Sequence, residues 1–135
     1  MIGVLAARGT ERALIVHGDD GLDELTISTT SQVVELVDGE IRHYRVDPAD
    51  YGIATVPKEA LVGGDPATNA ELARRVLAGE EGPHRDIVSL NAGAGLVAAG
   101  LAPDLAAGID AARASIDGGG AARALDLLVA VSNAE

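Results

Sequence analysis

The chain has no cysteine, no phenylalanine and no tryptophan, and its two aromatic residues are Tyr44 and Tyr51. The lack of cysteine excludes disulfide bonds and thiolate metal sites. Because large aromatic side chains are missing, Ala, Val, Leu, Ile and Gly have to fill the core, and each of them buries little area. Hydrophobic residues nevertheless make up 47% of the 135 residues, which is enough for one domain over residues 1–135.

Basic side chains are also scarce. The chain has 10 Lys and Arg residues against 21 Asp and Glu residues, which gives a formal net charge of −11. We therefore expect neither nucleic acid nor an anionic membrane surface as a partner, because both are bound by clustered Lys and Arg. A phosphate ligand is compatible with the charge, since a metal ion can bridge two negative partners.

Long apolar runs are missing as well. None approaches the ~20 residues that a membrane-spanning helix needs. The opening stretch MIGVLAARG has no basic segment before it and is too short for a signal peptide. These missing signals lead us to expect a cytoplasmic protein.

The hydrophobic pattern predicts an α/β fold that begins with a short strand and a β-hairpin. Residues 1–8, followed by Gly9, have the pattern of the last turns of a helix that is cut in its middle. The apolar run RALIVHG, residues 12–18, is typical of a parallel strand. The alternating stretch 25–47 is interrupted by Asp38-Gly39, a dipeptide that predicts a hairpin because both turn residues need positive φ.

From residue 57 onward the period becomes helical. The caps and glycine stops predict four helices, over residues 66–79, 83–100, 103–119 and 121–132. We find no internal repeat and no low-complexity linker. The expected order is therefore a strand, a hairpin and a run of helices.

Three glycine-rich stretches resemble ligand loops but have simpler explanations. In VGGDPATN (62–69) the Asp65 carboxylate would compete with an anion, so a capped helix start is favoured over a phosphate loop. In NAGAGL (91–96) the glycines indicate close helix packing, and we expect Asn91 to be a buried amide bonded to backbone rather than a ligand. DGGGAA (117–122) predicts a helix stop and a hinge.

The histidines and hydroxyl side chains form no recognisable constellation. His17, His43 and His84 lie at a strand end, in the hairpin and at a helix start, without metal-ligand spacing. His17 lies near the acidic stretch, where we favour a polar residue at a strand end over a functional group. The hydroxyls of Ser28 to Ser31 define no catalytic triad.

The stretch HGDDGLDEL, residues 17–25, is the main candidate for chemistry. It places four carboxylates directly after the apolar run, at Asp19, Asp20, Asp23 and Glu24. The first two suit a tight turn, whereas adjacent Asp23 and Glu24 can both reach one hard cation such as Mg²⁺. Ligands of open α/β sheets bind beyond the carboxyl ends of strands, which fits this position. On these observations alone, a solvated acidic turn is favoured over a metal site.

Several blocks of the chain, in this order, resemble the C-terminal part of anthranilate phosphoribosyltransferase from tryptophan biosynthesis. They are GLDE (21–24), DGEI (38–41), DPADYG (47–52), GGD before a helix (63–65) and RDIVSLNA (85–92). The resemblance covers nearly the whole chain. It implies an incomplete C-terminal α/β domain of the nucleoside phosphorylase/phosphoribosyltransferase type over residues 1–135.

The resemblance also implies an activity and a metal site. The family transfers the ribosyl phosphate of 5-phosphoribosyl diphosphate to anthranilate and releases pyrophosphate, and its members are usually homodimers. Its Asp-Glu pair binds the magnesium that bridges to the diphosphate, so Asp23 and Glu24 are the implied metal ligands here. The metal stabilises the charge of the leaving diphosphate, and no protein nucleophile is implied.

Other parts of that family have no counterpart in the chain. They are the glycine-rich diphosphate loop, the anthranilate-contacting residues and the helical dimerisation domain. We therefore expect the chain to be roughly the last third of the enzyme, inactive alone, and able to pair with a separate N-terminal half. Two alternatives are a non-catalytic interaction module with exposed sheet edges and helix faces, and a related pyrimidine nucleoside phosphorylase.

Overall fold

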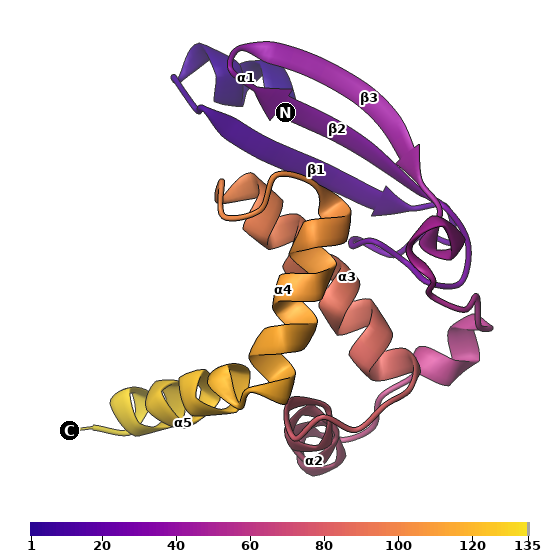
Figure 1. Cartoon of the computed structure of the whole chain (residues 1–135), viewed down its shortest axis with the longest axis vertical. Coiled ribbons are helices and arrows are strands. Elements are labelled where there is room, and N and C mark those ends of the chain that lie inside the picture. The colour runs from indigo at the N-terminus through magenta and orange to yellow at the C-terminus, as the bar shows by residue number, and fades with distance from the viewer. Residues whose placement is uncertain (135) are drawn as a thin grey trace.

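The structure, a computed structural model, describes residues 1–134 and has an α/β architecture in which a small sheet precedes a group of helices (Figure 1). The predicted order of elements is confirmed. In chain order they are α1 (Ile2–Ala7), β1 (Arg12–Gly18), β2 (Ser31–Val37), β3 (Glu40–Val46), 3₁₀ turns at Pro48–Tyr51 and Lys58–Leu61, α2 (Pro66–Leu77), α3 (Pro83–Ala98), α4 (Leu105–Asp117) and α5 (Gly120–Ser132).

The three strands form one antiparallel sheet in the order β1-β2-β3. The parallel pairing predicted for β1 is wrong among the described residues, because its neighbour is antiparallel β2, with Ile15 opposite Val34. A parallel neighbour needs a long crossover, usually a helix. Residues 19–30 contain no helix, so the chain returns beside β1 in the opposite direction.

The hairpin between β2 and β3 forms at the predicted place. Asp38 and Gly39 have φ angles of 50° and 82°, as a two-residue hairpin turn requires. The predicted alternation is wrong for residues 25–30, which form an irregular segment before β2. Its first three residues, Leu25, Thr26 and Ile27, are fully buried, so the pattern there reflects a buried loop and not a strand.

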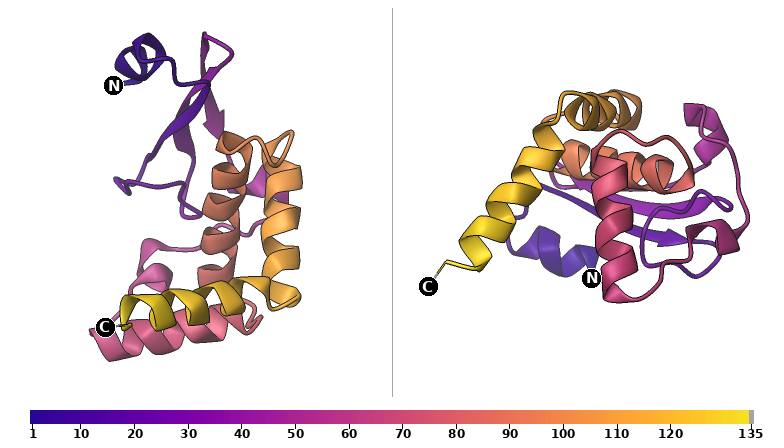
Figure 2. Two further views of the ribbon diagram at one scale, coloured as in Figure 1. Left: turned by 90° about the vertical axis from the view of Figure 1, so that its left-hand side faces the viewer. Right: turned by 90° about the horizontal axis from the view of Figure 1, so that it is seen from below.

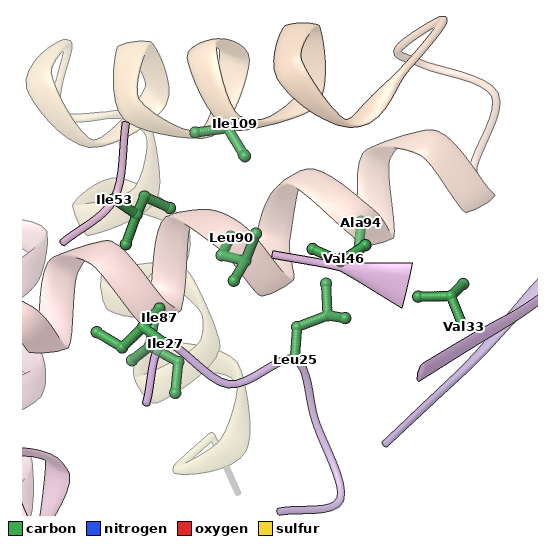
Figure 3. Close-up of a cluster of buried hydrophobic side chains, with 9 residues drawn as sticks. All are labelled: Leu25, Ile27, Val33, Val46, Ile53, Ile87, Leu90, Ala94 and Ile109. Carbon is green, nitrogen blue, oxygen red and sulfur yellow. The ribbon is translucent and has the colours of Figure 1, made fainter. Parts of the chain in front are cut away.

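The core lies between the sheet, this irregular segment and α3 (Figure 3). Leu25 and Ile27 point toward the helix from the segment after the acidic turn, and Leu90 of α3 lies at the centre of the cluster. The buried members of the cluster are Leu25, Ile27, Val33, Val46, Ile53, Ile87, Leu90, Ala94 and Ile109. The segment that follows the acidic residues is therefore a structural part of the core.

Helices α3 and α4 lie side by side and approach each other at two glycines (Figures 1 and 2). A Cβ atom on Gly93 would lie 2.7 Å from the Ile109 nitrogen, and one on Gly108 would lie 2.5 Å from the Gly93 oxygen. The close packing predicted from NAGAGL is thus confirmed at Gly93. At Gly95 a Cβ would meet nothing within 4 Å.

The helices begin and end largely at the capping residues and glycines predicted from the sequence. Gly9 has a φ of 80°, after α1, and Asp65 caps α2 by accepting a hydrogen bond from the Thr68 amide at 2.8 Å. Helix α4 begins two residues later than predicted, because Asp104 rather than Pro103 provides the cap and accepts from the Ala107 amide. Capping by a carboxylate explains both starts.

Helices α1 and α5 lie at the margins of the molecule. Figure 2 shows α1 on the side of the sheet that faces away from α3 and α4, and α5 extending outward from the end of α4. The apolar side chains of α5 are largely uncovered, since the exposed fraction is 64% for Leu128 and 46% for Val129. None of the helices in the described part of the chain is long and apolar enough to cross a membrane.

Candidate metal centre

The acidic stretch forms a tight turn at the carboxyl end of β1. The Gly18 amide donates to the Leu22 carbonyl at 2.9 Å, and the Gly21 amide donates to the Gly18 carbonyl at 2.9 Å. Gly21 has a φ of 92°, a conformation that side-chain-bearing residues rarely adopt. The turn places the pair Asp23 and Glu24 directly before the buried Leu25.

Asp19 is occupied by three side-chain partners. Its carboxylate accepts hydrogen bonds from Thr30 Oγ1, from Gln32 Nε2 at 2.9 Å, and from Arg45, with which it also forms an ion pair. Its own amide donates to the Thr30 carbonyl at 2.9 Å. Asp19 therefore joins the end of β1 to β2 and β3, and its oxygens are already in use.

Asp20 is occupied as well. One of its oxygens accepts from the Leu22 amide at 3.2 Å, and the other accepts from Thr26 Oγ1 at 2.8 Å. Partial burial acts to raise its pKa, but these hydrogen bonds and the charge of Lys58 outweigh burial and lower the pKa. The Lys58 ammonium also donates to the Asp20 carbonyl at 3.1 Å. Asp20 thus stabilises the turn itself.

Acid should weaken the fold partly through Asp19. Hydrogen bonds from Thr30 and Gln32, and then the Arg45 charge, lower its pKa below the ordinary 3.8. A carboxylate with a lowered folded-state pKa stabilises the fold above its unfolded pKa, and this stabilisation is lost as the pH falls through the folded value. In urea unfolding between about pH 5 and pH 2, stability should fall less steeply in Asp19→Asn than in the wild type.

The matched control for this titration is Asp110→Asn, on the exposed surface of α4. It should keep the wild-type pH dependence, because no ion pair involving Asp110 is found within residues 1–134. If Asp19→Asn and wild type lose stability with the same slope, Asp19 is not a source of the acid sensitivity.

Asp23 and Glu24 differ from the other two acids, because neither takes part in an ion pair or side-chain hydrogen bond in the described part of the chain. Both are exposed at the surface. Partial burial, and then the negative charge of Asp23, raise the pKa of Glu24. The two carboxylates are therefore close enough to repel each other, and a shared cation would relieve this repulsion.

The donor set fits a hard cation that is shared with a ligand. Residues 1–134 contain no group of three or more His, Cys, Asp or Glu side chains placed to hold a metal. The protein thus offers two carboxylates and leaves the other positions free. Magnesium commonly uses one or two carboxylates, several waters and the phosphates of a substrate.

Asn91 of α3 holds the backbone directly after this pair. Its Oδ1 accepts from the Leu25 amide at 2.9 Å, and its Nδ2 donates to the Leu25 carbonyl at 2.8 Å and to the Ile87 carbonyl at 3.0 Å. The prediction of a backbone-bonded amide at Asn91 is confirmed. The identity of its partner, 66 positions away in the sequence, could not be predicted.

The structure does not bring the histidines together. His17 is exposed on β1 opposite Gln32, His43 lies on β3, and His84 lies in the first turn of α3. Among the hydroxyls, Ser31 has a role that the sequence did not reveal, because its Oγ accepts from the buried Thr26 amide at 2.9 Å. The run of Ser and Thr between the acidic turn and β2 was the available signal for such bonds.

With the fold and the acidic turn described, the chain can be compared with known protein families. Residues 1–122 match the glycosyl transferase family, a/b domain, and the chain belongs to this family. The match includes the acidic turn, the sheet, and helices α2 to α4.

The relatives compared here are anthranilate phosphoribosyltransferases. Anthranilate phosphoribosyltransferase of Nocardioides sp. is 54% identical over 137 residues, which cover 98% of this chain and 40% of that protein. The crystal structure of anthranilate phosphoribosyltransferase from Thermus thermophilus aligns with a TM-score of 0.81 and 44% identity, over 91% of this chain and 36% of that one. A Saccharomyces cerevisiae variant of the enzyme with Mg bound aligns at 0.75 and 25% identity, over 85% and 34%.

The chain therefore spans about 40% of the length of the curated relatives that it matches. The remaining residues of those relatives lie outside the matched region.

Proposed function

We propose that this chain is the C-terminal part of the α/β domain of an anthranilate phosphoribosyltransferase, in which Asp23 and Glu24 hold a magnesium ion. The observation that carries the proposal is that these two neighbouring carboxylates have no ion-pair or side-chain hydrogen-bond partner in the described residues. The other two acids of the stretch, Asp19 and Asp20, both accept hydrogen bonds from side chains. Identity of 54% to a relative of that name, and a yeast relative with Mg bound, support it.

The proposed reaction moves a phosphoribosyl group from diphosphate, the leaving group, to anthranilate, the nucleophile. The bond from ribose C1 to the diphosphate oxygen breaks, a bond from C1 to the amino nitrogen of anthranilate forms, and that nitrogen loses a proton as pyrophosphate departs. When bound here, magnesium supplies positive charge where the leaving diphosphate gains negative charge. No nucleophile from the chain is required.

The residues of the chain have distinct tasks in this proposal. Asp23 and Glu24 provide oxygen ligands on the surface, whereas Asp19 and Asp20 hold the turn through their hydrogen bonds. This division keeps two negative charges out of the metal's coordination shell and fixes the loop that carries the ligands. Octahedral magnesium with two protein ligands retains room for diphosphate oxygens and water.

The substrate-holding parts of the enzyme lie, in this proposal, on an N-terminal portion with which the chain associates. The uncovered apolar side chains of α5, including Leu127 at 65% and Leu128 at 64% exposed, support such an association. A homodimer of the complete enzyme and a cytoplasmic location stay predictions. The same exposed apolar surface also supports the alternative, a non-catalytic interaction module.

Reconstitution of the enzyme tests the proposed function. The chain is joined to, or co-expressed with, the N-terminal portion of the Nocardioides relative, and anthranilate consumption is measured with 5-phosphoribosyl diphosphate and Mg²⁺. We expect transfer in the combined protein and none with either part alone. A combined protein that is folded and associated but shows no transfer, with or without Mg²⁺, would favour the interaction module.

A further inference from the structure

We propose that Asn91 is a positioning residue for the metal site, because its carboxamide fixes the main chain of Leu25 directly after Asp23 and Glu24. This inference rests on the proposed function of those two carboxylates. It assigns the task of aiming the ligands to Asn91 of α3, which lies 66 positions from Leu25 in the sequence.

The geometry of the contact is that of a two-point clamp. Asn91 accepts from the amide of Leu25 at 2.9 Å and donates to the carbonyl of the same residue at 2.8 Å. Two bonds to one residue fix both the position and the rotation of its backbone, since hydrogen bonds are directional. A second donated bond, to the Ile87 carbonyl at 3.0 Å, fixes the amide against its own helix.

Burial of the Leu25 side chain does not replace this clamp. Leu25 is 1% exposed and packs in the core, but apolar contact is non-directional and leaves its peptide groups free to rotate. A rotation at Leu25 would move the two preceding carboxylates, Asp23 and Glu24, together relative to the rest of the fold. The two hydrogen bonds of Asn91 therefore fix the orientation of the Leu25 backbone, which the apolar contact of its side chain does not fix.

The turn is also held on the other side of the pair. Asp20 accepts from the Leu22 amide at 3.2 Å and from Thr26 Oγ1 at 2.8 Å. Asp23 and Glu24 thus lie between two fixed points, at Leu22 and Leu25, while their own side chains have no ion-pair partner in the described residues. This arrangement pre-organises two ligands without occupying them.

The chain contains a matched control for this contact. Asn69 makes the same kind of clamp on Gly64, accepting from its amide at 2.7 Å and donating to its carbonyl at 3.0 Å. That clamp belongs to the capped start of α2 and holds none of the proposed ligands. Loss of Asn69 removes two amide-to-backbone bonds and loss of Asn91 removes three, but only the loss of Asn91 should affect magnesium.

The test measures two quantities for the reconstituted enzyme in four forms: the Mg²⁺ dependence of transfer, and the affinity for Mn²⁺ without turnover, followed by electron paramagnetic resonance. The four forms are the wild type, Asn91→Leu, Asn69→Leu and the double variant Asp23→Asn/Glu24→Gln. The Mn²⁺ affinity should fall in the same variants in which the half-saturating Mg²⁺ concentration rises. We expect Asn91→Leu to raise the half-saturating Mg²⁺ concentration about tenfold, as loss of an outer-shell partner commonly does. At saturating Mg²⁺ the rate should largely recover. Asn69→Leu should keep the wild-type half-saturation.

Each outcome decides one question. Wild-type half-saturation in Asn91→Leu, or an equal shift in Asn91→Leu and Asn69→Leu, overturns the positioning role while leaving the proposed function standing. Unchanged magnesium dependence in the double variant overturns the metal site itself, and the role of Asn91 with it. If Asn91→Leu does not fold, Asn91→Ala takes its place, since it removes the amide without adding volume, and the same shift is expected.

Discussion

The double substitution Asp23→Asn/Glu24→Gln should lower the rate of anthranilate transfer by the reconstituted enzyme at least about a hundredfold. Amides keep the shape of the side chains but remove both negative charges, so the cation is held weakly and the leaving diphosphate loses its partner. Metal stabilisation of such charge amounts to several kcal/mol, and each ~1.4 kcal/mol corresponds to a tenfold rate change. The measurement is the steady-state rate at saturating substrate and a fixed Mg²⁺ concentration.

The control for this experiment removes the same number of charges elsewhere. Glu71→Gln/Asp110→Asn changes two exposed acids on α2 and α4 and should leave the rate within about twofold of wild type. Circular dichroism establishes that both double variants are folded. A rate in Asp23→Asn/Glu24→Gln equal to that of the control would remove these residues from the mechanism.

Gly108→Ala should destabilise the fold by about 1–3 kcal/mol. The added Cβ would lie 2.5 Å from the Gly93 oxygen, a backbone atom that cannot move without separating α3 from α4. Helix separation would also disturb the core, because Ile109 and Leu90 belong to one cluster. The measurement is the free energy of unfolding from urea titration.

Gly95→Ala provides the comparison within α3. At this position a Cβ meets nothing within 4 Å, so the substitution should stabilise the protein by about 0.5–1 kcal/mol through helix propensity alone. Opposite signs for Gly108→Ala and Gly95→Ala are expected. Stabilisation in both would mean that the helices do not pack through Gly93 and Gly108.

Local signals in the sequence were sufficient for much of the fold. Asp38-Gly39 predicted the hairpin because few dipeptides accept two positive φ angles, and Asp65 predicted the start of α2 because its carboxylate can accept an amide hydrogen bond. Both signals act over a few neighbouring residues. Such short-range chemistry can be read directly from a single sequence.

Features set by distant parts of the chain could not be read in this way. The apolar run of β1 predicts burial but not the direction of the neighbouring strand, and its partner proved antiparallel. The alternation after Glu24 is compatible with a strand, and only the bonds of Thr26 to Ser31 and Asp20 show a fixed loop instead. Pairing with β2 decides the first case, and side-chain hydrogen bonds around the segment decide the second.

The candidate site likewise has features that the sequence predicts and features that depend on the three-dimensional fold. The adjacent acids alone favoured a solvated turn over a cation site, and the resemblance implied Asp23 and Glu24 as metal ligands. The sequence assigned Asp19 and Asp20 to the turn, but it could not identify the donors that occupy them, in Thr26, Gln32 and Arg45. The contact of Asn91 with Leu25 likewise requires the three-dimensional fold.

Direct location of the bound ion is the sharpest test of magnesium binding by this turn. The reconstituted enzyme is crystallised with 5-phosphoribosyl diphosphate and Mn²⁺ in place of Mg²⁺, and the anomalous signal of manganese gives the ion's position. We expect the ion roughly 2 Å from carboxylate oxygens of Asp23 and Glu24, with diphosphate oxygens completing its shell. An ion bound to the diphosphate with neither carboxylate among its ligands would contradict the assignment.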